Sequence, residues 1–317
     1  MPAKSSVPPG KRTAFVSHYD CSRHDTGWGH PDHQGRLPAV MRAVHADMLA
    51  LFDSLEEVEG RHADESELRL VHTPEYISRV RSWADSARSA NGPIEIRPGL
   101  VASGATWDAS LAAVGSVLQA VDIVLDGLTS NAFCAIRPAA RDAGADGSGR
   151  FGYFNQVAIA ARYLTLEDAA PLVLVLWGAP DAGSLRGIFP ESRVRVVEVE
   201  HAPSTPPADG RDRHSARHGG DTLESATRAA LESVSTESSP GLVLLSASFD
   251  AGAEGSRGRA EGAAGEYFGA TRAVMDFAEA ACGGRLVSIL EGGYSSSLGS
   301  AIVGHLRALA DLDPVQE

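Results

Sequence analysis

Cysteine is scarce in this 317-residue sequence. Its three cysteines, Cys21, Cys134 and Cys282, are far apart and form no C-x-x-C pair. A disulfide framework or a cysteine-rich zinc site is therefore not expected. Free thiols of this kind are typical of a reducing compartment, so we expect a cytoplasmic protein.

Positive charge is also scarce, and lysine is almost missing. Lys4 and Lys11 are the only lysines, and 28 Lys and Arg residues stand against 41 Asp and Glu, which gives a net charge of −13. Proteins that bind nucleic acid neutralise phosphates with clustered Lys and Arg. We therefore expect no nucleic-acid partner.

Long apolar runs are missing as well. No stretch approaches the roughly 18 uninterrupted apolar residues that predict a spanning helix, so we expect no membrane partner. Residues 1–12 contain no apolar segment of the kind found in secretory signals. We expect them to form a flexible tail.

Histidine, in contrast, is plentiful, with 11 residues beside the three cysteines. By composition alone, this ratio favours metal chemistry with His and Asp ligands over thiolate chemistry. The positions of the histidines must decide whether that interpretation holds.

Short apolar runs alternate with segments of helical spacing along most of the chain. Continuous apolar runs bounded by Gly, Pro or charge are typical of strands buried on both faces of a parallel sheet. The sequence therefore predicts an α/β fold, a single domain with a doubly wound, mostly parallel sheet flanked by helices. The expected domain covers 13–312, with an irregular loop at 201–220 and a C-terminal tail at 313–317. The expected strands are 13–17, 131–136, 172–177, 194–199, 242–248 and 286–290, and the expected helices are 37–52, 74–83, 109–125, 155–164, 222–234, 265–281 and 298–312.

Ligands of open parallel sheets bind beyond the carboxyl ends of the strands. The segments at those positions, and several others, resemble the histone deacetylase and acetylpolyamine amidohydrolase family, which has the arginase–deacetylase fold. The matching motifs, in this order, are HDTG at 24–27, VHTPEY at 71–76, FGYFNQVAIAA at 151–161, SASFDA at 246–251 and LEGGY at 290–294.

The resemblance implies a zinc ion held by two Asp and one His, a pair of acid–base histidines and a tyrosine that stabilises the oxyanion. This sequence departs from most of that pattern. Arg141 and Asp142 stand at the positions of the His pair, and Gly178 and Pro180 stand at two of the three zinc-ligand positions. The groups that would orient the histidines are also replaced, by Leu176 and Gly183.

Two residues of the family's chemistry remain: the third ligand, Asp250, and the tyrosine, Tyr294. One carboxylate does not hold zinc tightly, so we expect zinc to be absent or weakly bound. The leading interpretation is a deacetylase-like pseudoenzyme that lacks zinc-dependent amide hydrolysis and binds a small ligand or a protein partner in the former active-site cleft. In this interpretation the protein partner includes a second copy of the chain or another deacetylase-like protein, so that a homo- or hetero-oligomer forms.

The alternative is a repurposed, metal-independent enzyme that acts on a small anionic or acyl substrate. Its candidate catalytic residues are Tyr294, Asp250, Asp142 and Arg141. The residues at 250 and 294 also have a structural interpretation, because Asp250 could cap the next turn or pair with Arg141, and the glycines before Tyr294 could serve a tight turn.

The arginines near the former site suggest an anion-binding pocket. Guanidinium groups bind carboxylates and phosphates with two parallel hydrogen bonds. We expect Arg137, Arg141 and Arg150 to form such a pocket, unless Arg141 and Asp142 pair with each other. The expected ligand-binding residues are Phe151, Arg150, Arg137, Asp25 and Gly293.

Overall fold

The computed structural model describes residues 12–166, 171–178, 185, 188–189, 193–199, 222–234, 239–250 and 260–315. The expectations at Pro180 and Gly183, the loop at 201–220 and most of the N-terminal tail lie outside the described residues.

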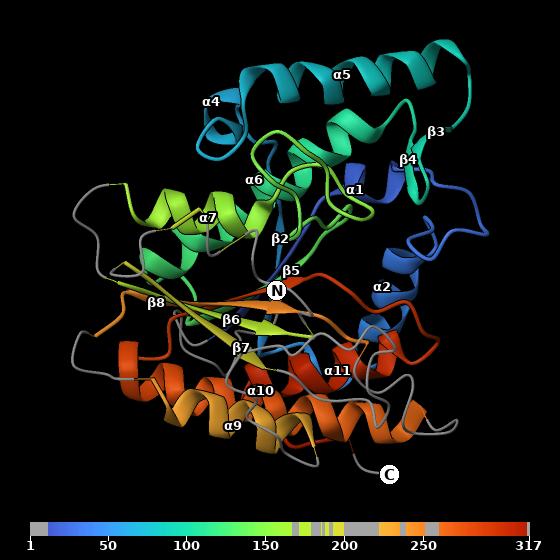
Figure 1. Cartoon of the computed structure of the whole chain (residues 1–317). Helices are drawn as coiled ribbons and strands as arrows, with labels where there is room; N and C mark the ends of the chain where they lie inside the picture. Colours follow the sequence, from blue (N-terminus) through green and yellow to red (C-terminus); the bar gives the residue numbers. More distant parts are fainter. Residues whose placement is uncertain are drawn as a thin grey trace, which may run out of the picture.

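Seven parallel strands form one twisted sheet at the centre of the molecule (Figure 1). Their order is β2-β1-β5-β9-β8-β6-β7, and a separate antiparallel pair, β3–β4, lies to one side. The strands of the large sheet are β1 (Thr13–Ser17), β2 (Leu55–Glu59), β5 (Asn131–Ala135), β6 (Leu172–Trp177), β7 (Val194–Val199), β8 (Leu242–Ala247) and β9 (Leu286–Leu290); the pair is β3 (Ile94–Arg97) and β4 (Leu100–Ala102).

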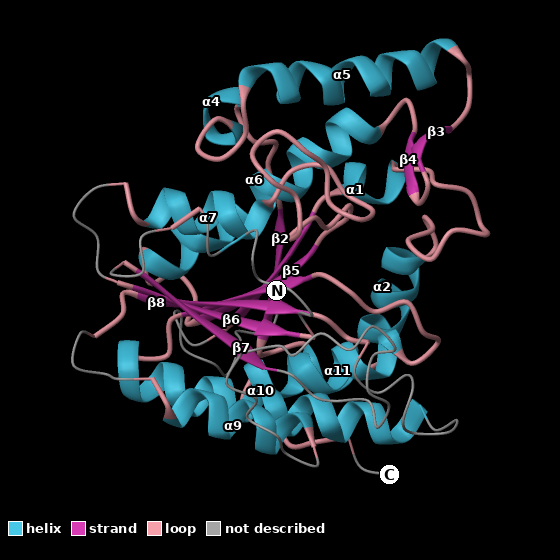
Figure 2. Ribbon diagram, viewed as in Figure 1, coloured by secondary structure: helices cyan, strands magenta, loops and turns pink. Residues whose placement is uncertain are grey.

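Helices cover both faces of this sheet, as Figure 2 shows. In one layer α10 contacts α9 and α11, which in turn contacts α2; in the other α6 contacts α7, α1 and α5. The predicted fold class, a single α/β domain with a parallel sheet between helices, is thus confirmed. The helices are α1 (Tyr19–Arg23), α2 (Arg36–Ala46), α3 (Met48–Leu51), α4 (Glu65–Leu68), α5 (Pro74–Ser89), α6 (Thr106–Leu125), α7 (Gln156–Leu164), α9 (Leu223–Glu232), α10 (Ala260–Cys282) and α11 (Leu298–Leu309).

The inner strands are the apolar runs that the sequence predicts. Every residue of β5, β6, β8 and β9 is buried, as expected for strands with helices on both faces. The edge strands differ. β7 exposes the charged Arg195, and β2, with the sequence LEEVE, exposes most of its residues and was not predicted because it has no apolar run.

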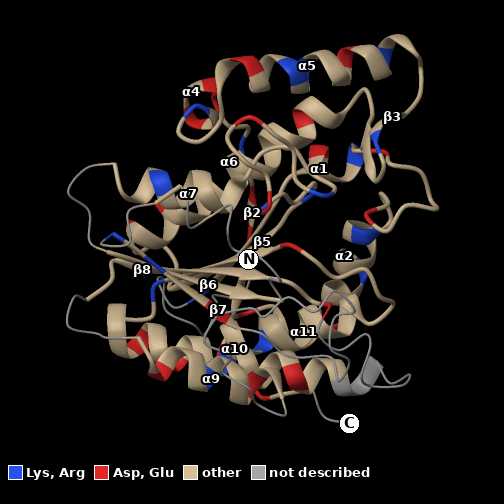
Figure 3. Cartoon of the chain, viewed as in Figure 1, with Lys and Arg blue, Asp and Glu red and all other residues tan. Residues whose placement is uncertain are grey.

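One helix, α6, is long and apolar enough to cross a membrane by length and composition, but 67% of its most apolar window is buried inside the protein. A core helix of this fold gives the same pattern, because it packs between α7 and α1. Acidic and basic residues alternate along the outer helices, whereas the central strands carry almost none (Figure 3).

Candidate functional site

The carboxyl ends of four adjacent strands, β5, β9, β8 and β6, bring the sequence-predicted site residues to one end of the sheet. Arg141 and Asp142 follow β5, Gly178 follows β6, Asp250 follows β8 and Tyr294 follows β9. The parallel arrangement alone produces this convergence.

Arg141 lies across the end of β6. Its Nη1 donates to the carbonyl oxygen of Trp177 at 2.8 Å and to Ser246 Oγ at 3.2 Å, and its Nη2 donates to the carbonyl oxygen of Gly178 at 2.7 Å. Among the residues that the structure describes, no carboxylate forms an ion pair with this guanidinium, and its other N–H groups find no acceptor. Arg141 is therefore a half-buried cation that neutral acceptors hold in place.

Asp142 forms no ion pair with its neighbour Arg141 in the described part of the chain and instead contacts the backbone of Arg150. The exposed Asp142 carboxylate accepts the backbone N–H of Arg150 at 2.7 Å through Oδ2. The chain passes so close that a Cβ built at Gly149 would lie 2.0 Å from Asp142 Oδ1. Asp142 thus closes the turn that leads to Phe151.

Asp250 ties the end of β8 to the turn after β9. Its Oδ1 accepts the backbone N–H groups of Gly293 and Tyr294, both at 3.0 Å, and its Oδ2 accepts the hydroxyl of Ser248 at 2.9 Å. Asp250 therefore caps the turn after β9, whereas the turn that directly follows it, from residue 251, lies outside the described residues. The neighbouring Gly293 has φ +117°, a conformation that favours glycine, and it supplies backbone groups rather than a side-chain contact.

The residues at the positions where the resemblance places the zinc ligands do not fit a catalytic zinc ion, and the structure describes two of them, Gly178 and Asp250. Gly178 has no donor atom and adopts a left-handed φ of +61°, and proline at position 180 has no donor atom either. Both carboxylate oxygens of Asp250 already accept hydrogen bonds from the protein. Zinc in proteins needs at least three N, O or S ligands, and this set supplies one carboxylate at most.

Arg137 does not belong to the expected pocket of three arginines. Its side chain is 0% exposed and forms an ion pair with Asp32, with Nε 3.1 Å from Oδ1. It also donates to the carbonyl oxygens of His24 and Asp32 and to the hydroxyl of Thr26. Arg137 is therefore a buried structural residue that fixes the loop after α1, and its place in the ligand-binding set was wrong.

Aromatic rings and cations meet beside the site. The rings of Phe151 and Tyr294 are in edge-to-face contact, with centroids 5.5 Å apart. Arg150 lies 5.1 Å from the centre of the Phe151 ring, and Arg36 lies 4.5 Å from that of Tyr294. These contacts place Phe151 beside Tyr294 and Arg150 beside Phe151, and the role of Arg150 and Phe151 in ligand binding stays a prediction.

Asp25 has a local role in the structure. Its Oδ1 accepts the backbone N–H of Gly27 at 2.8 Å, and its own N–H donates to Ser103 Oγ. This side-chain turn shapes the loop before Trp28, which is exposed.

Glu291 is the residue that sequence reasoning missed. It is completely buried, its Oε1 accepts from Gln156 Nε2 at 2.9 Å, and its Oε2 lies 3.4 Å from the backbone nitrogen of Arg141. Burial raises the pKa of Glu291 to about 8, although Arg141 lowers it in part. At pH 7 a mostly protonated Glu291 therefore leaves the charge of Arg141 uncompensated. The motif LEGGY contained this residue, but no pattern indicated its burial.

The raised pKa of Glu291 predicts a pH-dependent stability. The unfolded chain releases this proton near its ordinary pKa, about 4.3, whereas the folded protein keeps it until about pH 8. Stability from the protonated form is therefore complete below the unfolded pKa and is lost as pH rises toward 8. We expect Glu291→Gln, which carries no proton to lose, to gain stability relative to wild type between pH 5 and 8, by up to about 5 kcal/mol.

Urea unfolding of both proteins at pH 5, 6.5 and 8 measures this difference. Glu279→Gln, on the exposed face of α10, is the matched control, for which no trend of this size is expected. A constant difference between Glu291→Gln and wild type across the three pH values would contradict the assignment.

The buried histidines have structural roles. His24 bonds to Thr106 Oγ1 at 2.9 Å, and burial, with Arg137 nearby, lowers its pKa to about 3. His72 accepts the backbone N–H of Asn155, and burial lowers its pKa to about 4. Both are neutral at physiological pH and serve the packing of their loops.

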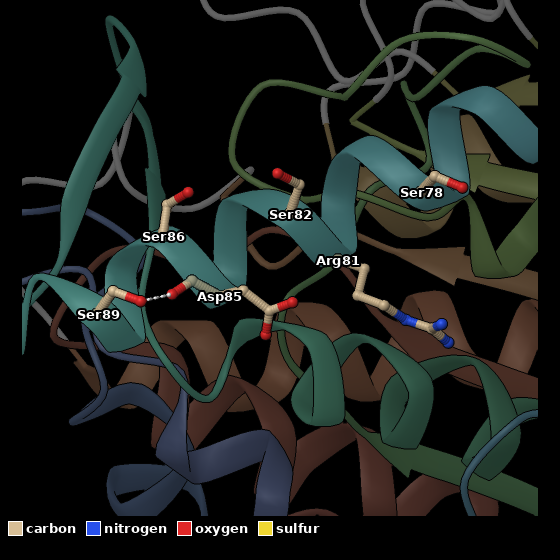
Figure 4. A pocket seen from close by; sticks show the side chains of 6 residues that line it. All are labelled: Ser78, Arg81, Ser82, Asp85, Ser86 and Ser89. Carbon is tan, nitrogen blue, oxygen red and sulfur yellow. Dashed lines mark hydrogen bonds between the residues drawn. The ribbon is translucent and has the colours of Figure 1, made fainter.

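A shallow depression of about 560 Å³ lies elsewhere, on the outer face of α5 (Figure 4). Its lining is hydrophilic, and Ser89 there donates to the carbonyl oxygen of Asp85 within the same helix. Because all its residues come from one exposed helix, it has no part in the site at the strand ends. They are Ser78, Arg81, Ser82, Asp85, Ser86 and Ser89.

Comparisons with known proteins agree with this architecture. The histone deacetylase domain family matches residues 30–176 and 213–309, so the chain belongs to that family. The unmatched interval, 177–212, includes positions 178 and 180.

Individual relatives are distant. Histone deacetylase 18 of Arabidopsis thaliana is 27% identical over 280 residues, which cover 80% of this chain and 40% of the relative. A protein described as a probable deacetylase from Archaeoglobus fulgidus is 24% identical over 318 residues, which cover 95% of this chain and 87% of the relative. This chain therefore spans less than half of the Arabidopsis relative and most of the archaeal one.

The crystal structure of the HDA15 HD domain has the same fold. It aligns with a TM-score of 0.77 and 21% identity over 96% of this chain and 90% of that one.

Proposed function

We propose that this protein is a non-hydrolytic, deacetylase-like protein that binds a small anion at the strand ends through Arg141. The observation that carries the proposal is the position of the Arg141 guanidinium, which donates to the carbonyl oxygens of Trp177 and Gly178. The resemblance assigns the catalytic histidine to position 141 and a zinc ligand to position 178. The fixed positive charge of Arg141 thus lies beside Gly178, which has no side-chain atom that could bind a metal.

Charge supports an anion as the ligand. Arg141 has no carboxylate partner among the described residues, and burial keeps Glu291 mostly protonated at neutral pH. Guanidinium N–H groups that remain free bind carboxylate or phosphate oxygens well. Arg150, which is exposed and close to Phe151, adds a second positive charge for a ligand that also contacts the ring.

The repurposed metal-independent enzyme has less support. Asp250 would have to act as a base, but both its oxygens accept hydrogen bonds from Gly293, Tyr294 and Ser248. Burial raises the pKa of Tyr294 above its ordinary value, which makes this hydroxyl a poorer acid. Asp250 and Tyr294 are thus poorly placed to activate water, and the exposed Asp142 closes the turn before Phe151.

The proposal also covers the binding partner of the protein and its cellular compartment. The net charge of −13 and the mixed charges on the outer helices favour neither nucleic acid nor a membrane surface. We propose a cytoplasmic protein that binds its ligand alone or in an oligomer with itself or another deacetylase-like chain.

Titration with sulfate and acetate tests the anion site. We expect millimolar sulfate to raise the melting temperature of the wild-type protein saturably, since a ligand that binds only the folded state stabilises it. Arg141→Gln should remove the saturable part and leave only the weak, linear effect of an excluded salt. Arg150→Gln should weaken the effect less.

Exposed Arg42→Gln, on α2, is the control that changes net charge equally. A saturable sulfate response that Arg141→Gln retains would contradict the assignment to Arg141. No saturable response to sulfate or acetate in the wild type would contradict an anion as the ligand.

A further inference from the structure

A second cluster of polar side chains lies at the same, carboxyl end of the sheet but toward its other edge, after β1 and β2. His18 directly follows β1, and His62 comes shortly after β2. The two strands are parallel neighbours with Ser17 opposite Glu59, and the N–H of Gly60 donates to the carbonyl oxygen of Ser17 at 2.8 Å. This pairing brings the two histidines together, although 43 residues separate them in the sequence.

Asp20, in the first turn of α1, completes the cluster. The Nε2 of His62 lies 2.8 Å from Asp20 Oδ2, and the Nδ1 of His18 lies 3.8 Å from the same oxygen. The two imidazole rings are 4.8 Å apart between centroids. One ligand atom from each of the three residues lies within 4.8 Å of the others.

Neighbouring groups orient this cluster. Arg23 donates to Asp20 Oδ1 at 2.8 Å, which leaves Oδ2 facing the histidines. The N–H of Asp20 donates to His18 Nδ1 at 3.1 Å without an ion, and a metal bound by this nitrogen takes the place of that hydrogen bond. His62 is the most exposed member, with 40% of its side-chain surface accessible, so an ion can enter from solvent.

From these contacts we propose that His18, Asp20 and His62 bind a divalent transition metal, with zinc as the best match. Two imidazole nitrogens and one carboxylate oxygen, with water in the fourth position, are a common zinc ligand set. Magnesium and calcium prefer all-oxygen ligands, whereas this cluster offers one carboxylate and two imidazole nitrogens. The cluster is separate from the site of Arg141, which lies at the end of β6.

The geometry requires only a small closure around the ion. Zinc bonds of about 2.0–2.2 Å place tetrahedral ligand atoms roughly 3.3–3.6 Å apart. The 2.8 Å between His62 Nε2 and Asp20 Oδ2 has to lengthen, which rotation of the exposed His62 side chain allows, and the 3.8 Å between His18 Nδ1 and Asp20 Oδ2 has to shorten slightly. The bound ion replaces the hydrogen bonds that Asp20 makes with His62 and His18, and it ties α1 to the segment after β2.

Zinc titration of the metal-stripped full-length protein tests the proposal. We expect one saturable zinc site per chain in the wild type and a loss of affinity of at least tenfold in His62→Ala. Cobalt(II) added to the wild type should give the visible absorption of a four-coordinate site, and His62→Ala should not. His45→Ala, which removes an exposed histidine of α2, should bind zinc as the wild type does.

Two results would overturn the proposal. One is the absence of saturable zinc binding in the wild type. The other is zinc binding that His62→Ala retains with unchanged affinity. Circular dichroism of each variant shows whether it is folded, and His18→Ala gives an independent second removal of a ligand.

Discussion

Arg137→Met is expected to lower the free energy of unfolding by about 3–5 kcal/mol, because it breaks a fully buried ion pair and leaves the other charge without its partner. Asp32 would keep only Arg36, whose Nη1 lies 2.5 Å from Asp32 Oδ1. Burial raises the pKa of Asp32, but Arg137 and Arg36 outweigh it and hold this pKa below its ordinary value. The carbonyl oxygen of His24 would also lose its donor. Urea denaturation at pH 7 measures the loss.

The matched control is Arg150→Met, which removes an exposed arginine from the same expected pocket. We expect it to change stability by no more than about 0.5 kcal/mol. A loss below about 1 kcal/mol for Arg137→Met would contradict the structural role and return Arg137 to the candidate ligand-binding residues.

Substitutions of Asp250 should show whether its carboxylate caps a turn or binds a metal. We expect Asp250→Ala to destabilise the protein by about 2–4 kcal/mol, because three donors, one of them the N–H of Tyr294, lose a charged acceptor. Asp250→Asn keeps Oδ1 as an acceptor and can donate to Ser248 Oγ, so it should cost about 1 kcal/mol or less. Thermal and urea unfolding of both variants measure the difference.

A metal ligand would behave differently. Replacing a zinc-binding carboxylate with either Asn or Ala removes the ligand, so the two variants would lose stability alike in the presence of zinc. Equal losses that appear only when zinc is present, and vanish with a chelator, would contradict the role of Asp250 as a cap.

The inner strands and the meeting of the site residues could be predicted from sequence, because continuous apolar runs mark buried parallel strands and their ends converge. The edge strand β2 could not, since its Glu residues face solvent and only its pairing with β1 makes it a strand. The sequence also could not predict the direction in which each side chain points. Arg137 and Arg141 are close in sequence, yet one is completely buried and the other lies across the end of β6.

Burial and partners also decided the roles of single carboxylates. Asp250 stands where the resemblance places a zinc ligand. Only the structure shows that its carboxylate accepts the backbone N–H of Gly293 in the turn after β9. Glu291 lies inside a motif, and its raised pKa follows from its burial in the folded protein, which the motif does not show. The cluster of His18 and His62 depends on the pairing of β1 with β2, which composition could not show.

The zinc content of the His62→Ala protein tests the central claim most directly, because this variant lacks the cluster at the ends of β1 and β2. Any zinc that remains after dialysis against excess free zinc and then buffer must then be bound elsewhere. We expect metal analysis to find less than one tenth of an equivalent per chain, and an acetyl-lysine peptide to show no turnover with zinc added. One equivalent of zinc, together with turnover that Asp250→Asn abolishes, would contradict the account.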